Sequence, residues 1–410
     1  MVFYKTKQNF FGESIVMDMK KFKIGIFGCG RGMFVADQIK NNFSDEACVY
    51  ALCDRRKDQL DKATENFPEA LAFNNFDDFI ECGMDAVVLA NYFHEHAAFA
   101  IRALEKGIAV LSETTAAVTM KECVELVEAV ERTGGKYTLA ENYPFAAARL
   151  EMKRVYETGS LGKVMYGEGE YCHPSSIEEI RDLDPEEHHW RKYNPVTYYL
   201  THSLAPLIHM TGALPVSVNA RTCYDEGRAE RINRKYNDVA AIMLLGMDND
   251  SVFRITGCAM FASHGTWYRL ACTDGAIETV RGNGSAVRLN YVPWNLPEGE
   301  EEEKIYCPTW QTNNELAEKA GHGGGDFWVV HNFLEYLKGN QGPDFDVYTA
   351  TRMAATAIQA WRSVLNGSAS YPIPDFRNKA DRMAYANDNL TPLADDWGKG
   401  ATLPQDSRMR

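Results

Sequence analysis

Short apolar runs alternate with amphipathic segments along the first third of the chain. The apolar runs predict buried strands, and the helical spacing between them predicts helices. Thr119 and Glu122 stand three residues apart, as in a capping box, and Gly134 and Gly135 end the helix that follows. Strands are expected at residues 21–27, 48–53, 85–90, 108–111 and 137–140, with further helices at 33–39 and 96–106. This alternation predicts a doubly wound parallel sheet of the Rossmann type.

The pattern changes after residue 140. Strands now follow one another without intervening helices, which favours an open and mostly antiparallel sheet. Strands are expected at residues 164–171, 239–245, 251–258, 267–272 and 276–280, and helices at 146–156, 327–337 and 349–365. The acidic run at residues 297–303 is interpreted as a solvated loop.

A chain of 410 residues is too long for one ordinary core, so two α/β domains are expected. We predict a dinucleotide-binding Rossmann domain at 21–143 and a substrate-binding α/β domain at 144–375. Residues 376–410 are interpreted as a C-terminal extension. The second sheet has two faces to cover, which favours a homo-oligomer.

Composition excludes several classes of protein. The net charge of −14 argues against a nucleic-acid partner, and no apolar run approaches the 18 residues of a membrane span. Residues 1–20 lack an apolar core before a cleavage site, so they are interpreted as a short extension rather than a signal peptide. The ten cysteines are irregularly spaced and form no C-x-x-C pair, which favours a reduced, cytoplasmic protein. No motif pairs a cysteine with a base, so a catalytic cysteine is disfavoured.

A glycine-rich turn follows the first predicted strand. Small residues there let the backbone approach a pyrophosphate held at a helix N-terminus. Asp54 comes 26 residues after Gly28, where an acid that binds ribose hydroxyls is expected. Asp54 favours NAD, and Arg55 and Arg56 leave NADP possible; the alternative is a plain tight turn with a capping aspartate. The expected cofactor contacts from the turn are Gly28, Gly30, Arg31, Gly32 and Met33.

Several stretches resemble the glucose–fructose oxidoreductase / inositol dehydrogenase (Gfo/Idh/MocA) family. They are Asn91 with the segment from His96 to Gly107, Val110 to Glu113, and the late segment from Ala360 to Ser368. The resemblance implies an NAD(P)-dependent oxidoreductase acting on a carbohydrate, with further cofactor contacts from Asn91, His96, Glu113 and Asn142. In this family a lysine after Glu113 assists proton transfer, but here that position is Thr114, which cannot act as a base near neutral pH.

The lysine is also absent from a branch of NAD-dependent glycosidases typified by α-N-acetylgalactosaminidase. The chain is similar to that branch in five segments: Glu141-Asn142, Tyr171 to His173, Trp190-Arg191, Tyr199 to Pro206, and Gly321 to Phe327. The resemblance implies catalytic roles for Tyr171, His173, Tyr199 and His202. It implies substrate contacts from Glu141, Arg191 and His322.

The residue types agree with these roles. His202 can exchange protons near pH 7, and Tyr199, three residues away, would share its face on a helix. Tyr171 and His173 would share one face of a strand. For each of these side chains the alternative is a packed, hydrogen-bonded residue without a catalytic role. No metal is expected, because the adjacent residues His94, Glu95 and His96 cannot easily bind one ion, and the pair His188 and His189 is more typical of a surface.

Three functions remain open at this point. In the first, NAD⁺ oxidises a sugar carbon, C3 in our interpretation, the leaving group departs from C1, water adds, and the hydride returns. The second is a plain sugar dehydrogenase that releases keto sugar and NADH. The third is a cofactor-binding sensor that has lost catalysis.

Overall fold

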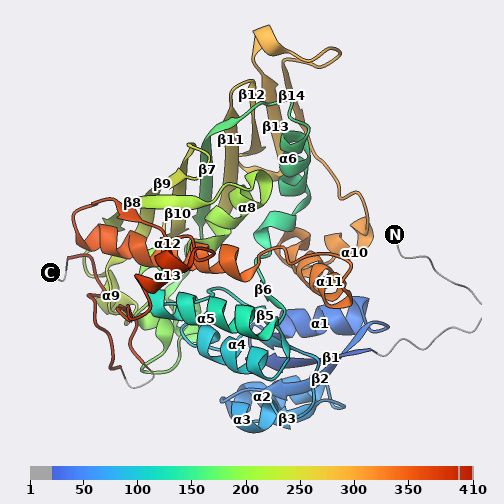
Figure 1. Ribbon diagram of the computed structural model, residues 1–410, viewed down its shortest axis with the longest axis vertical. Coiled ribbons are helices and arrows are strands. Elements are labelled where there is room, and N and C mark those ends of the chain that lie inside the picture. The colour runs from blue at the N-terminus through green and yellow to red at the C-terminus, as the bar shows by residue number, and fades with distance from the viewer. Residues whose placement is uncertain (1–20, 396–397, 409–410) are drawn as a thin grey trace, which may run out of the picture.

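The computed structural model describes residues 21–395 and 398–408. The extension expected at residues 1–20 lies outside the described residues. Two sheets organise the chain, a lower one of six strands and an upper one of nine (Figure 1). The predicted α/β fold class, a parallel sheet followed by a mostly antiparallel one, is confirmed. The proposed domain boundaries stay a prediction.

The first sheet is parallel throughout and has the order β3-β2-β1-β4-β5-β6. Its strands are β1 (Phe22–Phe27), β2 (Ala47–Cys53), β3 (Leu71–Phe73), β4 (Ala86–Leu89), β5 (Ala109–Ser112) and β6 (Tyr137–Leu139). Strand order reverses between β1 and β4, and a ligand of an open parallel sheet binds at the carboxyl ends beside such a reversal.

Five helices connect these strands: α1 (Met33–Asn42), α2 (Lys57–Asn66), α3 (Phe76–Phe79), α4 (His96–Glu105) and α5 (Met120–Thr133). The predicted capping box is present, because the Thr119 side chain accepts from the Glu122 N–H and the Glu122 side chain accepts from the Thr119 N–H. Gly134 ends α5 at φ 63°, a left-handed conformation that favours glycine.

The second sheet has the order β14-β13-β12-β11-β7-β10-β9-β8-β15. Among the described strand pairs of this second sheet, only β7–β10 is parallel, and the others are antiparallel. The strands are β7 (Val164–Cys172), β8 (Pro215–Tyr224), β9 (Asp238–Met247), β10 (Val252–Ala259), β11 (Gly265–Cys272), β12 (Gly275–Val280), β13 (Asn283–Tyr291), β14 (Glu303–Tyr306) and β15 (Tyr371–Pro372).

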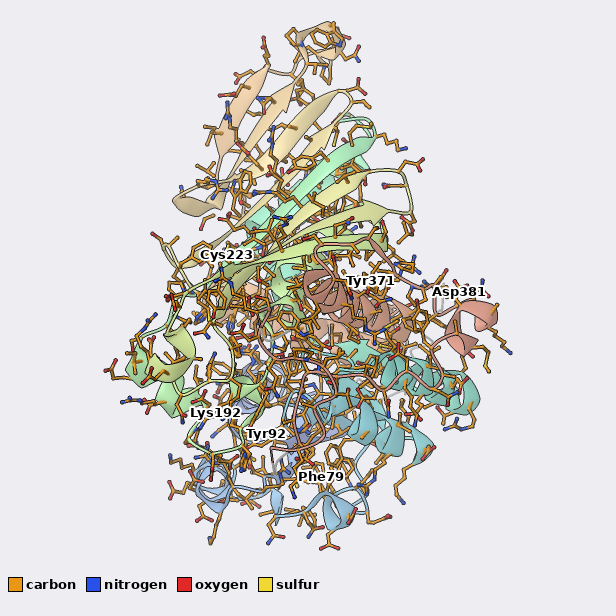
Figure 2. The ribbon with its side chains drawn as sticks, turned by 90° about the vertical axis from the view of Figure 1, so that its left-hand side faces the viewer. Phe79, Tyr92, Lys192, Cys223, Tyr371 and Asp381 are labelled. Carbon is orange, nitrogen blue, oxygen red and sulfur yellow. The ribbon has the colours of Figure 1, made fainter. Side chains whose placement is uncertain are left out.

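Helices α6 (Ala147–Glu157), α8 (Thr201–Thr211) and α12 (Val347–Leu365) pack against this sheet. The sheet also carries a ladder of ion pairs in which Glu168 lies 2.8 Å from Arg254 and Arg288 lies 2.5 Å from Glu303. Exposed apolar side chains, such as Leu244 of β9 and Ile305 of β14, also lie on this sheet. Figure 2 shows the strands fanning out above the Rossmann domain.

Further helices complete the second half of the chain: α7 (Ile177–Leu183), α9 (Arg228–Arg231), α10 (Asn314–Glu318), α11 (Gly325–Lys338) and α13 (Lys379–Met383). Strands β3, β8, β13, β14 and β15 were not predicted. In β8 the polar Asn219 and Arg221 alternate with the buried Val218 and Ala220, so no continuous apolar run marks this strand. Strand β14 starts at the last residue of the expected acidic loop.

Residues 376–395 and 398–408, here called the C-terminal segment, pack back onto both domains. Asp388 accepts two hydrogen bonds from Arg362 of α12, and its carbonyl accepts the Lys121 N–H of α5. Farther along, Ser407 donates to Asp238 at the start of β9. The C-terminal segment therefore connects the Rossmann domain with the second domain. Within the described residues, no helix is both long enough and apolar enough to cross a membrane.

Candidate active site

A cleft of about 510 Å³ opens at the carboxyl ends of β1, β2 and β4. One end is lined by Gly28, Gly30 and Asp54, and the other by second-domain residues that include Tyr171 and His202. The predicted residues Arg31, Asn91, His96, Glu113, Asn142, His173, Arg191, Tyr199 and His322 also line this cleft. The fold therefore brings most of the predicted site residues together from both domains.

The glycine-rich turn depends on the absence of side chains. Gly28 has φ +97°, and a Cβ there would come within 2.2 Å of the Ala90 carbonyl oxygen. A Cβ on Gly32 would lie 2.5 Å from the Gly28 oxygen, so Gly32 allows the turn to close onto α1. Neither Gly32 nor Met33, the first residue of α1, is part of the cleft wall. These two residues shape the turn, whereas Gly28 and Gly30 face the open space.

Asp54 lies directly after β2 and lines the cleft. Its oxygens accept the Cys29 N–H at 2.7 Å and the Arg56 N–H at 2.8 Å, so it also serves the capping role that the sequence left open. Burial raises the pKa of Asp54, and the two N–H donors partly offset that effect. Arg56 is paired with Asp58, and Arg55 lies 3.3 Å from Glu95. Both arginines thus have carboxylate partners, which favours NAD over NADP.

Three buried acceptor atoms in the cleft have no hydrogen-bond partner. They are the amide oxygens of Asn91 and Asn142 and the hydroxyl oxygen of Thr114. Buried polar atoms are usually satisfied, so these three are available to a bound ligand. Together with the close approach at Gly28 and the carboxylate of Asp54, they fit a dinucleotide.

His96 lies beside this end of the cleft and is almost completely buried. Its Nδ1 is 3.1 Å from the Thr115 carbonyl oxygen and its Nε2 is 3.3 Å from the Asn91 carbonyl oxygen. Burial lowers the pKa of His96, so the ring is neutral and connects two loops.

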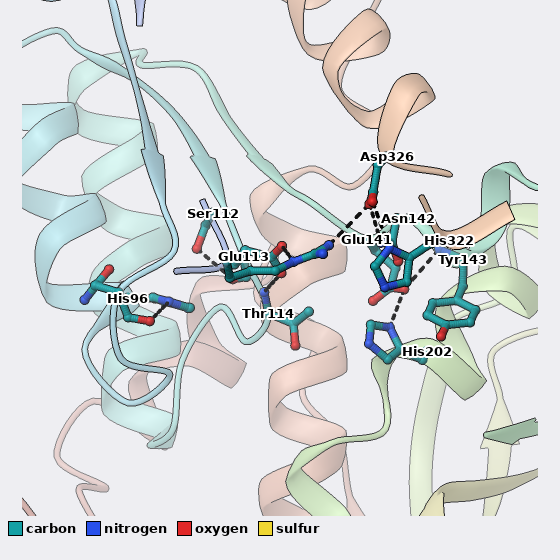
Figure 3. Close-up of polar contacts among 12 residues, drawn as sticks. His96, Ser112, Glu113, Thr114, Glu141, Asn142, Tyr143, His202, His322 and Asp326 are labelled. Carbon is teal, nitrogen blue, oxygen red and sulfur yellow. Dashed lines mark hydrogen bonds and ion pairs between the residues drawn. The ribbon is translucent and has the colours of Figure 1, made fainter. Parts of the chain in front are cut away.

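A polar network links the glycine-rich turn to the second domain (Figure 3). Arg31 Nε donates to Glu113 at 2.6 Å, and its guanidinium lies 3.3 Å from Asp326. Asp326 also accepts from Asn142 at 2.8 Å and lies 2.8 Å from His322 Nδ1. Burial opposes ionisation of Asp326, but His322 and Arg31 outweigh it and lower the pKa of the carboxyl group. The network fixes Arg31 and His322 at the cleft wall.

His202 and Glu141 form a buried pair at the second-domain end. His202 Nδ1 lies 2.7 Å from Glu141 Oε1, and the Glu141 side chain is fully buried. Figure 3 shows Glu141 beside His202, whereas the sequence suggested a substrate contact for Glu141. A carboxylate at Nδ1 selects the tautomer with a free Nε2, so Glu141 orients His202 rather than lining the cleft.

Three tyrosine rings surround the His202 imidazole. The ring centroids of Tyr143, Tyr171 and Tyr199 lie 4.4, 5.0 and 5.2 Å from it. Burial, followed by the neighbouring Tyr199 and Tyr143, raises the pKa of Tyr171, and burial raises the pKa of Tyr199. Both phenols stay protonated and can donate hydrogen bonds.

The expected helical face shared by Tyr199 and His202 is wrong. Helix α8 begins at Thr201, and Tyr199 precedes it in a non-helical conformation with φ −105° and ψ 52°. The two rings meet nevertheless, because the chain turns between them. Tyr171 and His173 lie at and just beyond the end of β7, with ring centroids 5.7 Å apart. Burial lowers the pKa of His173, and the neighbouring His264 adds to that effect.

Two residues of the site were not singled out from the sequence. Tyr143 packs on His202, and Asp326 anchors the polar network. Both stand inside segments that carry the resemblance, Tyr143 directly after Asn142 and Asp326 in the glycine-rich segment after His322. Their positions in those segments are the signal that could have found them. Across residues 21–395 and 398–408 there is no group of three His, Cys, Asp or Glu side chains that could hold a metal ion.

Family models match both domains. Residues 22–141 match the oxidoreductase family with an NAD-binding Rossmann fold (Gfo/Idh/MocA). Residues 275–381 match the C-terminal domain of glycosyl hydrolase 109. The first match covers the glycine-rich turn and Asp54, so the first domain has an NAD-binding Rossmann fold.

Similar proteins agree with these matches. A glycosyl hydrolase family 109 protein of Shewanella sp. (strain W3-18-1) is 24% identical, with 89% of this chain and 87% of the relative covered. Two solved structures share the fold. The WlbA dehydrogenase from Bordetella pertussis, in complex with NADH and UDP-GlcNAcA, has a TM-score of 0.69 at 18% identity over 87% of this chain and 99% of its own. Levoglucosan dehydrogenase, in complex with NADH and L-sorbose, has a TM-score of 0.72 at 16% identity over 87% and 100%.

Proposed function

Since residues 22–141 match the Gfo/Idh/MocA oxidoreductase family and residues 275–381 match the C-terminal domain of glycosyl hydrolase 109, we propose that the protein cleaves a glycoside by oxidising the sugar transiently. The observation that carries this proposal is the His202–Glu141 pair, in which Glu141 supports His202 on the wall of a cleft where the usual lysine is replaced by Thr114. We assign cofactor binding to residues 21–143 and substrate binding to residues 144–375.

Bound NAD⁺ supplies a reversible acceptor for hydride from a carbinol carbon of the sugar, which we take to be C3. Gly28, Gly30, Arg31 and Asp54 would hold the dinucleotide, with Asn91 and Asn142 offering their unpaired amide oxygens.

His202 serves as the base for the sugar hydroxyl. Its Nε2 carries the free lone pair when Nδ1–H is donated to Glu141, and the buried carboxylate stabilises the imidazolium that forms on protonation. Thr114 cannot take this role because its hydroxyl does not ionise near neutral pH. The proton from the hydroxyl therefore goes to His202.

A ketone at C3 makes the C2–H acidic, so cleavage becomes a β-elimination. The C2 proton goes to a second base, the C1–O bond breaks, and the leaving oxygen takes a proton. His173 is neutral at pH 7 and suits the first task, and the phenols Tyr171 and Tyr199 are protonated donors for the second. Water then adds across C1 and C2, and the hydride returns to C3, so the sum is glycoside plus water giving sugar plus alcohol.

All ten cysteines are free thiols, which supports the proposal that the protein works in the reducing cytoplasm. The sheet of the second domain is the surface that we propose for self-association.

The test is a panel of aryl glycosides in D₂O, assayed with and without added NAD⁺. Redox-assisted cleavage releases the aryl alcohol without net NADH and leaves deuterium at C2 of the sugar. A plain dehydrogenase would instead accumulate NADH in proportion to keto sugar, with the glycoside bond intact. That result, or aryl release without deuterium at C2, would contradict the proposal.

A further inference from the structure

A second cavity of about 210 Å³ opens behind the sugar end of the cleft. Six residues line both spaces, so the two are neighbours: Tyr171, His173, Leu183, Trp190, Arg191 and Tyr199. Its volume is below the roughly 300–1,000 Å³ of a whole ligand site. The cavity therefore suits one part of a ligand whose remainder occupies the cleft.

Three arginines from two stretches of chain line this cavity: Arg191, and Arg228 with Arg234. Its wall contains no aspartate or glutamate. Arg234 has a buried partner, Asp184, at 3.2 Å. In the part of the chain that the structure describes, neither Arg191 nor Arg228 forms an ion pair. Three guanidinium groups thus face one carboxylate, which leaves an excess of two positive charges.

The surroundings of Arg228 and Arg191 lack an anionic partner for either guanidinium group. Arg228 Nε is buried without a hydrogen-bond partner, and its Nη2 lies 3.1 Å from the Met260 sulfur. The Arg191 guanidinium lies over the Trp190 ring, 4.3 Å from its centroid. Burial of an unpaired charge is costly, so an arginine with only a sulfur or a ring as neighbour still has capacity for an anion.

The positive charge of these arginines affects the pKa of a neighbouring histidine, His189. Burial lowers the pKa of His189 to about 3, and the charges of Arg191, Arg234 and Lys192 add to that effect. The cavity walls between the arginines are mostly apolar, including Ile180, Leu183 and Val196. Low polarity strengthens an interaction with an anion relative to water.

We propose that this cavity binds an oxyanion carried by the substrate, a carboxylate or a sulfate or phosphate ester, so that the enzyme acts on an acidic glycoside. Planar guanidinium groups match the geometry of such oxyanions and can bind them through two parallel hydrogen bonds. The inference rests on the proposed function, because the anion must belong to the molecule whose sugar lies in the cleft.

The experiment measures binding to the NAD-loaded protein by calorimetry, using matched pairs of probes. One arm compares 4-nitrophenyl glucuronides and galacturonides with the corresponding neutral glucosides and galactosides, in both anomers, and a second arm uses the 6-sulfates. A third arm places the charge in the leaving group, as a carboxyphenyl glycoside. We expect the acidic member of at least one pair to bind about tenfold or more tightly, as one charge-assisted hydrogen bond already supplies.

Two variants on α9 test the cavity itself. Arg228→Met removes a cavity guanidinium and should reduce the preference for the acidic probe about tenfold. Arg231→Met is the matched control, because Arg231 lies on the same short helix, is half exposed and is paired with Asp225. This control should keep the preference, and thermal unfolding confirms that both variants fold.

The outcomes separate the two proposals. No acidic preference in any arm, or a preference that survives in Arg228→Met, overturns the anion site even if neutral glycosides are cleaved. Inorganic sulfate that binds as tightly as the best acidic probe also overturns it, because the anion would then not belong to the substrate. Acidic preference with no release of aryl alcohol supports the anion site and contradicts the proposed cleavage.

Discussion

The two ends of the cleft hold their polar groups by different means. At the dinucleotide end Asp54 accepts N–H groups of Cys29 and Arg56, which lie 25 and 2 residues away along the chain. At the sugar end His202 pairs with Glu141 across 61 residues, and where the two ends meet Asn142 pairs with Asp326 across 184. A site built on one strand–turn–helix unit tolerates changes elsewhere, whereas a site assembled from distant segments fails when one segment shifts.

The largest effect is expected from His202→Gln. General acid–base assistance is typically worth about 10²–10⁴-fold, so turnover should fall within that range. NAD affinity should hardly move, because His202 lies at the sugar end. Steady-state kinetics and calorimetry measure the two quantities. Near-normal kcat would remove His202 from the mechanism and turn attention to Tyr199 or His173.

Glu141→Gln tests whether the buried partner positions His202. Loss of a charge-assisted hydrogen bond of roughly 1.5–3 kcal/mol should lower kcat about tenfold or more. KM should change little, because Glu141 does not line the cleft. A rise in KM at constant kcat would return Glu141 to the substrate-binding role suggested by the sequence.

Asp54→Ala addresses the other end of the cleft. The ribose hydroxyls lose a charged acceptor, and NAD affinity should fall about tenfold or more for the same energetic reason. Asp54→Asn is the matched variant, since it can still accept the Cys29 N–H and so separates the charge from the shape of the turn. Unchanged NAD affinity in Asp54→Ala would leave Asp54 with the capping role alone.

Lowering the pH should reduce the free energy of unfolding through His209 of α8, whose ring packs against Phe145 and Phe345. Burial lowers the pKa of His209 from 6.5 to about 4, so the unfolded chain binds a proton that the folded chain resists. Its stability contribution is complete above pH 6.5 and is lost as the pH falls towards 4. Between pH 7.5 and 5, the unfolding free energy of His209→Leu should therefore fall by about 1–2 kcal/mol less than that of the unaltered protein.

Denaturant unfolding at both pH values gives this difference. Ile208→Val is the control, because Ile208 is buried on the same helix and carries no titratable group, so this variant should lower stability by a similar amount at both pH values. An equal pH dependence in His209→Leu and the unaltered protein would contradict the assignment.

The smallest effect on the cleft is expected from Leu244→Glu. Leu244 of β9 is 49% exposed, on the sheet that we propose for self-association. Light scattering at micromolar concentration should show an oligomer for the unaltered protein and a smaller species for the variant, with turnover scarcely changed. A monomer in the unaltered protein would refute the proposed oligomer.

The sequence predicts the cofactor end better than the sugar end for a physical reason. Strand, turn and helix follow one another along the chain, so the apolar pattern and the position of Gly28 suffice to place Asp54. The pairing of His202 with Glu141 depends on how the two domains meet, and no local pattern encodes it. Strand β8 was missed although Asn219 and Arg221 alternate with the buried Val218 and Ala220, because it lacks the continuous apolar run that marked the other strands. The excess charge around Arg228 became visible only when distant segments lined one cavity.

The C-terminal segment has a consequence for how long the cofactor stays bound. It bonds to α5 of the Rossmann domain through Lys121 and to β9 of the second domain through Asp238, so it holds together the two domains that line the cleft. Widening the cleft by a hinge rotation would break these bonds together. A connection that resists opening of the cleft lengthens the residence time of NAD. This suits an enzyme that returns its cofactor to the starting oxidation state in every cycle. The protein should accordingly be purified with nucleotide already inside.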